Sequence, residues 1–334
     1  MLALQIKGVL IMTIIHHVSI INRKAEPSFH FYRNVLGLDL MMKTVNQDDN
    51  QMYHLFFGDA KGQPGTEVTI FEIEDGADKQ FGTNAIERLM FKVSSTEALY
   101  FWMERFDAFN ICHYGLEHIN GRDTVRFDAP DNTMLGLTVV HHDDNNVYPG
   151  PEHTDIPNDF RILSLDAIQL RVKYAQATIN ELERYYGFKA TDETSFFETD
   201  RQVTILRNQS SRFTHEIHII HDNDNEDEVT GIGSIHHVAL SIEGITELEA
   251  LHKALSDRNF YLSPIMNREF FQSIYYREPN NILIEVATME GHKIHQPNKD
   301  ATQFYDIPLV LPDYLENKRE KIEQLLKKKE GRAQ

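Results

Sequence analysis

The sequence predicts an α+β protein in which four β-α-β-β-β modules form two cupped, eight-stranded barrels, followed by a C-terminal helix. Strand-like apolar runs recur in the same order around four helical segments. Two of these segments, at residues 31–38 and 182–188, share one pattern in which aromatic residues precede a glycine. Two His-His doublets, 220 residues apart, each stand at the start of a strand-like run. The β-α-β-β-β module is too long for a solenoid repeat and too rich in strands for a helical bundle.

Each module is predicted as a first strand, a helix and three further strands, with Pro27 tolerated in the first turn of the first helix. We expect strands at 13–21, 39–44, 53–57 and 67–72 around a helix at 25–38; at 86–93, 111–114, 123–127 and 134–140 around a helix at 95–109; at 162–172, 195–198, 203–207 and 216–221 around a helix ending near 188; and at 234–242, 261–264, 270–277 and 282–287 around a helix at 246–256.

Polar segments predict the domain boundaries. Residues 141–159 contain three prolines and separate an N-terminal domain, 13–142, from a C-terminal domain, 160–292. The acidic residues 222–228 are interpreted as a solvated linker. In the tail, 293–334, a helix at 313–329 places four apolar side chains on one side, which could pack on the protein or on a second subunit, so a homo-oligomer stays open. These side chains are Leu315, Ile322, Leu325 and Leu326.

Composition excludes several classes of partner. A net charge of −18 argues against nucleic acid and anionic membrane surfaces, because both select basic patches. No segment has the order of a signal peptide or the length of a membrane span, and Cys112 is a single cysteine, so we expect a cytoplasmic protein. Because the first strand follows Met12 directly, Met12 is a second candidate for the native start.

The two His-His doublets are the strongest chemical signal. Side chains alternate between the faces of a strand, so only one imidazole of each doublet can enter a shared pocket. We assign His17 and His237 to that pocket. Glu285 lies within a strand of Ile, Leu and Val, where a carboxylate is costly to bury unless it is paired or binds a metal. Two imidazoles and one carboxylate leave positions open for substrate and dioxygen, which favours non-haem Fe(II).

The sister modules predict a single metal site. The matching strands carry Leu89-Met90 and Asp166-Ala167 instead of histidines, and Leu137 stands where the acid is expected. Four other histidines lack a strand acid in the corresponding place and are assigned to the surface: His141, His142, His215 and His218.

The chain resembles the vicinal-oxygen-chelate (glyoxalase/bleomycin-resistance/extradiol dioxygenase) superfamily over residues 13–292, most closely its hydroquinone-type ring-cleaving dioxygenases. The resemblance rests on the helix end at 31–38, on residues 15–17, 53–57, 62–66 and 235–237, and on the 268–285 segment. It implies iron on His17, His237 and Glu285, and implies roles around the iron for His16, Ser19, His236, Arg268 and Tyr275. It also implies a small aromatic substrate and O2.

One metal held by the first and fourth modules requires these two modules to share a cup, which leaves modules two and three to form the other. The resemblance implies the same pairing. Two other functions stay open: a glyoxalase-like metallo-lyase or thiol transferase on the same scaffold, and a metal-free protein that binds or sequesters an aromatic compound. A glyoxalase-like site usually has a second acid, and we find none in a matching strand.

Overall fold

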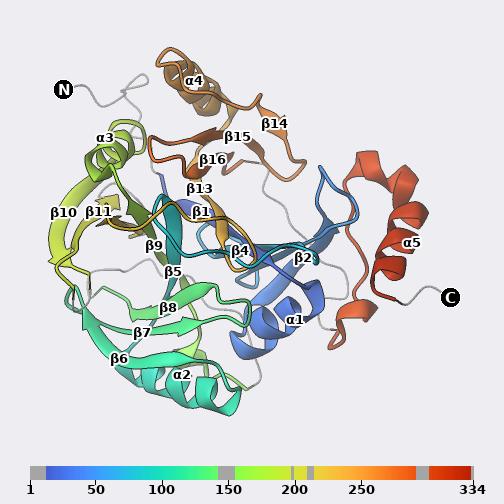
Figure 1. Cartoon of the computed structure of the whole chain (residues 1–334). Helices are drawn as coiled ribbons and strands as arrows, with labels where there is room; N and C mark the ends of the chain where they lie inside the picture. Colours follow the sequence, from blue (N-terminus) through green and yellow to red (C-terminus); the bar gives the residue numbers. More distant parts are fainter. Residues whose placement is uncertain (1–12, 142–154, 197–198, 209–213, 291–300, 332–334) are drawn as a thin grey trace.

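The computed structural model describes residues 13–141, 155–196, 199–208, 214–290 and 301–331 (Figure 1). Three expectations therefore concern residues outside these ranges: the native start, most of the 141–159 linker, and the surface position of His142. The strands form two eight-stranded sheets with the orders β14-β15-β16-β13-β1-β4-β3-β2 and β10-β11-β12-β9-β5-β8-β7-β6. The predicted α+β class and pair of cupped sheets are confirmed.

The elements follow the predicted module order. Module one is β1 (Ile15–Asn22), α1 (Ala25–Phe29) continued by a π-helical turn (His30–Val35), β2 (Asp39–Val45), β3 (Tyr53–Gly58) and β4 (Glu67–Glu72); module two is β5 (Ala85–Val93), α2 (Thr96–Ala108), β6 (His113–Ile119), β7 (Arg122–Asp128) and β8 (Met134–Val139). Module three is β9 (Ser164–Val172), α3 (Ala175–Tyr185), β10 (Phe188–Ser195), β11 (Gln202–Asn208) and β12 (Glu216–His221); module four is β13 (Ile235–Ile242), α4 (Ile245–Ser256), β14 (Met266–Asn267), β15 (Gln272–Arg277) and β16 (Leu283–Thr288).

The first strands of the modules join the sheets. β1 pairs with β13 in antiparallel orientation, which unites modules one and four, and β5 pairs with β9, which unites modules two and three. The predicted pairing is therefore confirmed. Helices α1 to α4 contact strands of their own modules, and most of the apolar core lies in one cluster that spans both sheets.

Three predicted strands are misplaced, and all three are edge strands. β6 begins at His113 instead of residue 111, β10 ends at Ser195 where residues 195–198 were predicted, and β14 lies at Met266–Asn267 instead of 261–264. β6 and β10 bury few side chains, so they lack the apolar run that marks an inner strand.

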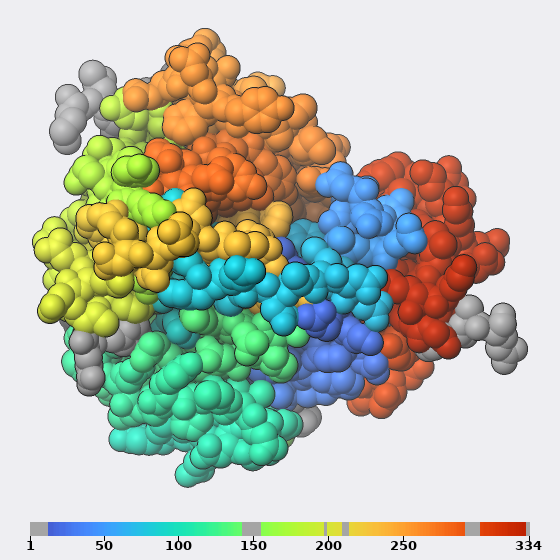
Figure 2. Space-filling view, viewed as in Figure 1, coloured from blue at the N-terminus to red at the C-terminus, as the bar shows by residue number. Residues whose placement is uncertain are grey.

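Two linkers, one between modules one and two and the other between modules three and four, pair with each other. Residues 78–83 form isolated bridges with residues 227–232, so the acidic segment is only partly the solvated linker that the sequence predicts. Figure 2 shows these two stretches, in cyan and gold, side by side on the surface. A Cβ added at Gly82 would lie 2.4 Å from the backbone of Glu226, so only glycine permits this approach.

The C-terminal segment packs against module one (Figure 2). It contains short 3-10 turns at Phe304–Asp306 and Asp313–Lys318 before α5 (Arg319–Lys329). The ammonium of Lys43 on β2 donates to the carbonyls of Phe304 and Ile307, at 2.8 and 2.9 Å. Leu315, Ile322 and Leu326 are buried in the core, whereas Leu325 is half-buried. None of the described helices is both long and apolar enough to cross a membrane.

A buried carboxyl lies at the seam between modules three and four. Tyr276 on β15 donates a hydrogen bond to Glu181 on α3, at 2.6 Å, and its oxygen also lies 2.6 Å from the hydroxyl of Tyr186. Burial raises the pKa of Glu181 to about 8. A protonated carboxyl can therefore join two elements here without placing a charge in the core.

Glu181→Gln is expected to make the free energy of unfolding less dependent on pH. The wild-type contribution is full below the unfolded pKa of 4.5 and is lost as the pH rises to about 8, because the unfolded chain ionises first. Since one pKa unit equals ~1.4 kcal/mol, the wild type should lose roughly 1–3 kcal/mol more than the variant between pH 6 and 8. Urea unfolding at both pH values measures the difference, and identical losses would contradict the assignment.

Candidate metal centre

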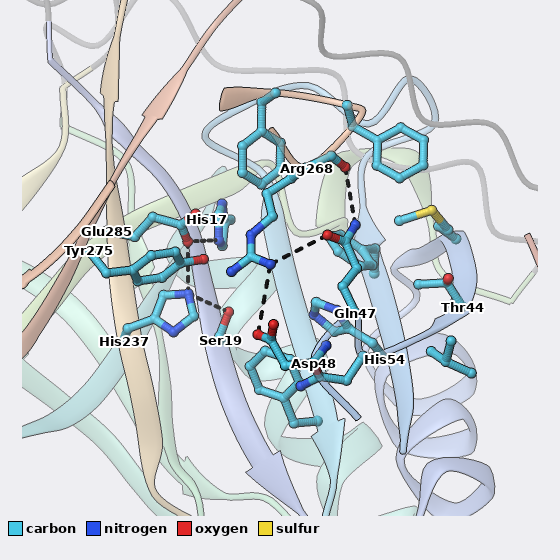
Figure 3. Close-up of a pocket in the computed structure, with 17 residues that line it drawn as sticks. His17, Ser19, Thr44, Gln47, Asp48, His54, His237, Arg268, Tyr275 and Glu285 are labelled. Carbon is cyan, nitrogen blue, oxygen red and sulfur yellow. Dashed lines mark hydrogen bonds and ion pairs between the residues drawn. The ribbon is translucent and has the colours of Figure 1, made fainter. Parts of the chain in front are cut away.

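Three buried side chains converge on the concave face of the first sheet (Figure 3). The Nε2 atoms of His17 on β1 and His237 on β13 each lie 3.0 Å from Oε2 of Glu285 on β16. One ligand atom of each residue lies within 4.8 Å of the others. These side chains are only 3, 2 and 0% exposed, respectively. The three residues singled out in the sequence are therefore brought together.

The donor set fits a metal ion. Both oxygens of Glu285 are buried, and neither has a hydrogen-bond partner among the described residues, although two imidazoles are adjacent. Burial opposes ionisation, but His17 and His237 hold the pKa of Glu285 well below its usual range. A buried carboxylate without hydrogen bonds is costly, and a cation shared with two imidazoles would compensate that cost.

The His-His doublets do not alternate as simple strands do. In the β1–β13 ladder, Ile15 pairs with Leu240 and His17 with Ala239, so His16 is an extra, bulged residue. Ser19 pairs with His237 and Ile20 with Ile235, so His236 is the extra residue of the other strand. A β-bulge turns the side chain of the extra residue, so that it can lie beside the side chain of the next residue. The expected placement of the two imidazoles on opposite faces is corrected accordingly.

Each bulge places two imidazole nitrogens in contact. The Nδ1 atoms are 3.0 Å apart in His16 and His17, and 2.8 Å apart in His236 and His237. One hydrogen must lie between each pair, so the tautomer of one ring fixes that of the other. A ligand that binds through Nε2 carries its hydrogen on Nδ1, and the adjacent histidine would then accept it.

A second cluster of possible ligands shares His17. Nδ1 of His16 lies 3.9 Å from Oε2 of Glu67 on β4, and these two residues with His17 also satisfy a three-ligand spacing. Neither His16 nor Glu67 lines the cavity beside the triad, whereas His17, His237 and Glu285 all do. The cavity thus gives a substrate access to a metal held by the triad.

The remaining predicted residues surround the triad at different depths. Ser19 Oγ lies 3.0 Å from His237 Nε2 and 2.7 Å from Thr69 Oγ1. Tyr275 pairs with Glu285 across β15 and β16, and burial together with the Glu285 charge raises the pKa of Tyr275 well above its ordinary value. The guanidinium of Arg268 lies 5.5 Å from the Tyr275 ring, and His236 is exposed.

The cavity at the triad measures about 70 Å³ and meets a hollow of about 380 Å³ that His236, Met52 and Leu283 help to line. Eleven residues that line the cavity at the triad were not predicted as site residues: Met42, Thr44, Val45, Asn46, Gln47, Asp48, His54, Phe56, Phe71, Phe270 and Phe271. Gln47 Nε2 donates to the Arg268 carbonyl at 3.3 Å, so the loop after β2 meets the loop after β14 (Figure 3). These loops leave opposite edges of the sheet, and no local sequence pattern predicts their contact.

The second cup contains an ion-pair network in place of a ligand set. Arg122 donates to both oxygens of Asp166, at 2.8 and 2.9 Å, and to Glu216 at 2.8 Å. Met90 on β5 pairs with Gly136 on β8, just as Ala239 on β13 pairs with Glu285 on β16 in the first cup. Gly136 therefore holds the position that corresponds to the acid, one residue before Leu137, where the sequence predicted it. A Cβ at Gly136 would lie 2.5 Å from the Met90 sulfur, so the end of the Met90 side chain fills the space beside this position.

The assignment of His215 and His218 to the surface is wrong. They are 0 and 7% exposed. His215 Nδ1 accepts a hydrogen bond from the Ile15 amide at 3.0 Å and thereby links the two sheets, while His218 Nε2 lies 2.7 Å from Glu216. His141 is half-buried and also contacts Glu216, at 2.9 Å. These side chains belong to the polar interior of the second cup, which the one-dimensional pattern does not reveal.

Comparison with known proteins agrees with this fold and site. A model of the Glyoxalase/Bleomycin resistance protein/Dioxygenase superfamily matches residues 14–131. The chain is 37% identical over 315 residues to the proposed ring-cleaving dioxygenase MhqA of Bacillus subtilis (strain 168), covering 94% of this chain and 98% of MhqA. The protein belongs to this superfamily. The chain is also similar to the chlorohydroquinone/hydroquinone 1,2-dioxygenase of Sphingobium indicum, with 20% identity over 280 residues, 83% of this chain and 85% of that enzyme.

Solved structures of other proteins share the architecture. A proposed dioxygenase from Bacillus subtilis superposes with a TM-score of 0.78 at 25% identity, covering 93% of this chain and 96% of that one. Glyoxalase I from Zea mays superposes with a TM-score of 0.62 at 12% identity, covering 84% and 94% of the two chains. The second likeness concerns the fold alone.

Proposed function

We propose that the protein is an Fe(II)-dependent dioxygenase that opens the ring of a hydroquinone-type aromatic compound. The observation that carries the proposal is the convergence of His17, His237 and Glu285 at a cavity, where both imidazoles lie 3.0 Å from one buried carboxylate oxygen. Two imidazoles and a carboxylate on one wall are typical of non-haem Fe(II) oxygenases. The relatedness to MhqA supports ring cleavage, and the similarity to a chlorohydroquinone/hydroquinone dioxygenase supports the substrate class.

The triad would hold the metal. Fe(II) bound there would supply the redox chemistry that lets dioxygen react with an aromatic ring. Cleavage by a dioxygenase breaks one ring carbon–carbon bond and places both oxygen atoms in the product, so it consumes no external reductant.

The other residues of the cavity bind the substrate and move protons. Tyr275 stays protonated because burial and Glu285 raise its pKa, so its hydroxyl can donate a hydrogen bond to a substrate oxygen. Arg268 keeps its positive charge on the same side of the cavity and can stabilise a phenolate. Phe71, Phe270 and Phe271 supply apolar walls for the ring. His16 would fix the tautomer of His17.

The aromatic walls favour a flat, weakly polar substrate, and the −18 net charge disfavours large anions. Among the described residues, the cluster with His17, His237 and Glu285 contains a single acid, which does not match the second acid expected of a glyoxalase-like site. A metal-free binding protein would leave the adjacent imidazoles, without a cation, to compensate the buried Glu285 carboxylate.

Oxygen uptake tests the proposal. The full chain is purified without oxygen, loaded with Fe(II), and mixed with hydroquinone, methylhydroquinone or catechol. We expect one dioxygen consumed per ring opened, with the hydroquinones preferred. Absence of uptake at full iron occupancy would refute the proposal, and activity restored only by Ni or Zn on a different substrate would favour the lyase alternative.

A further inference from the structure

Two side chains on the cavity wall each have a buried polar atom without a hydrogen-bond partner among the described residues. Thr44 on β2 and His54 on β3 are opposite each other in an antiparallel ladder, and both line the cavity of the triad. The Thr44 Oγ1 and His54 Nε2 atoms are buried, and neither has a hydrogen-bond partner among the described residues. Leaving such an atom unpaired costs on the order of 1–3 kcal/mol. A ligand that pairs with both would recover this cost.

The His54 ring is fixed and neutral. It stacks on Phe71 with a centroid distance of 4.2 Å and an angle of 27°, and it contacts Phe56 at 4.2 Å. Burial, reinforced by the nearby His17 and His237, lowers the pKa of His54 well below its ordinary value. A neutral imidazole carries one donor and one acceptor nitrogen, so it can hydrogen-bond to a hydroxyl in either direction.

The pair lies across the cavity from the triad. In the strand order, β16, β13 and β1 carry the triad, whereas β3 and β2 are two and three strands beyond β1. At ~4.8 Å per strand, β1 and β3 are roughly 10 Å apart. In Figure 3 Thr44 stands on the opposite side of the drawn residues from His17, His237 and Glu285. One aromatic ring with a polar atom at each end spans such a gap.

We propose that Thr44 and His54 form a subsite that binds the hydroxyl para to the one held at the triad. This inference rests on the proposed function and adds the residues that distinguish a para-diol from an ortho-diol. In an ortho-diol both oxygens lie at the same end of the ring, so the Thr44–His54 subsite would remain unpaired. A substrate with its second oxygen at the far end would satisfy both polar atoms, and the flanking Phe56 and Phe71 rings would exclude water.

Equilibrium binding tests the subsite without turnover. The dissociation constants of hydroquinone and of phenol, which lacks the second hydroxyl, are measured by calorimetry on the full iron-loaded chain without oxygen. In Thr44→Val and His54→Phe, which keep the size and the stacking, hydroquinone affinity is expected to fall about 3- to 10-fold, the worth of one hydrogen bond. Phenol affinity should stay unchanged, and Thr44→Ser, which keeps the hydroxyl, should bind hydroquinone as the wild type does.

Two results would overturn the subsite: unchanged hydroquinone affinity in both variants, or equal losses for hydroquinone and phenol, which would mean that the pair only shapes the cavity. The outcome is separable from the proposed function. If the wild type takes up oxygen but the ratio of hydroquinone to phenol affinity is the same in the variants as in the wild type, the subsite alone is refuted. If the variants change the ratio of hydroquinone to phenol affinity but the wild type takes up no oxygen, the subsite is supported and the proposed ring cleavage is refuted.

Discussion

Glu285→Gln is expected to remove bound iron and to reduce ring cleavage by roughly 10³-fold or more, because a metal supplies several kcal/mol of the catalysis. Glutamine keeps the shape of the side chain but removes the charge that two imidazoles and a cation would share. Iron content by elemental analysis and oxygen uptake measure the two effects, and thermal unfolding shows whether the fold is retained.

Glu67→Gln is the matched control, because Glu67 is equally buried and belongs to the alternative cluster with His16 and His17. It should keep its iron. Loss of iron in this variant, with retention in Glu285→Gln, would place the metal at the other cluster.

Substitutions of the two histidines of the first doublet should have different effects on iron content and turnover in the same assays. His17→Ala is expected to abolish iron binding, whereas His16→Ala should keep the iron and turn over ~10- to 100-fold more slowly, as is typical for a residue that orients a ligand. The 3.0 Å contact between their Nδ1 atoms gives the physical reason, since His16 would hold the hydrogen of the ligand ring. The reverse result would mean that the bulged residue is the ligand.

Tyr275→Phe is expected to lower kcat ~10²- to 10⁴-fold while iron content and the free energy of unfolding stay near wild type, because it removes one positioned proton donor. The hydroxyl belongs to the cavity that also contains Glu285 and Arg268. Steady-state oxygen uptake and the single-turnover rate after the anaerobic enzyme–substrate complex is mixed with oxygen, together with iron analysis, measure the change.

The adjacent Tyr276 provides the matched control. Its side chain points to the other face of β15, where its hydroxyl contacts Tyr186 and Glu181 at 2.6 Å each. Tyr276→Phe should therefore cost about 1–3 kcal/mol of stability, the penalty of unpaired buried groups, and leave kcat unchanged. Equal kinetic effects in the two variants would contradict a specific role for the Tyr275 hydroxyl.

The chemistry of the site could be found in the sequence because each of its ligands breaks a local pattern. A carboxylate among Ile, Leu and Val at Glu285, and histidine doublets at the start of two apolar strands, are conspicuous in one dimension. Once those three were assigned to one metal, the pairing of modules one and four followed, and the β1–β13 ladder has that pairing.

The sequence by itself thus determined the module order, the module pairing and the candidate ligands, since these depend on alternation and on residue types that a core does not tolerate. The tertiary structure alone decided the bounds of β6, β10 and β14, three edge strands that lack a clear apolar run, and the bulges at His16 and His236, which depend on the register between distant strands. It also decided the wall that Thr44 and His54 form. Their roles arise from atoms left unpaired after folding, which no local pattern encodes.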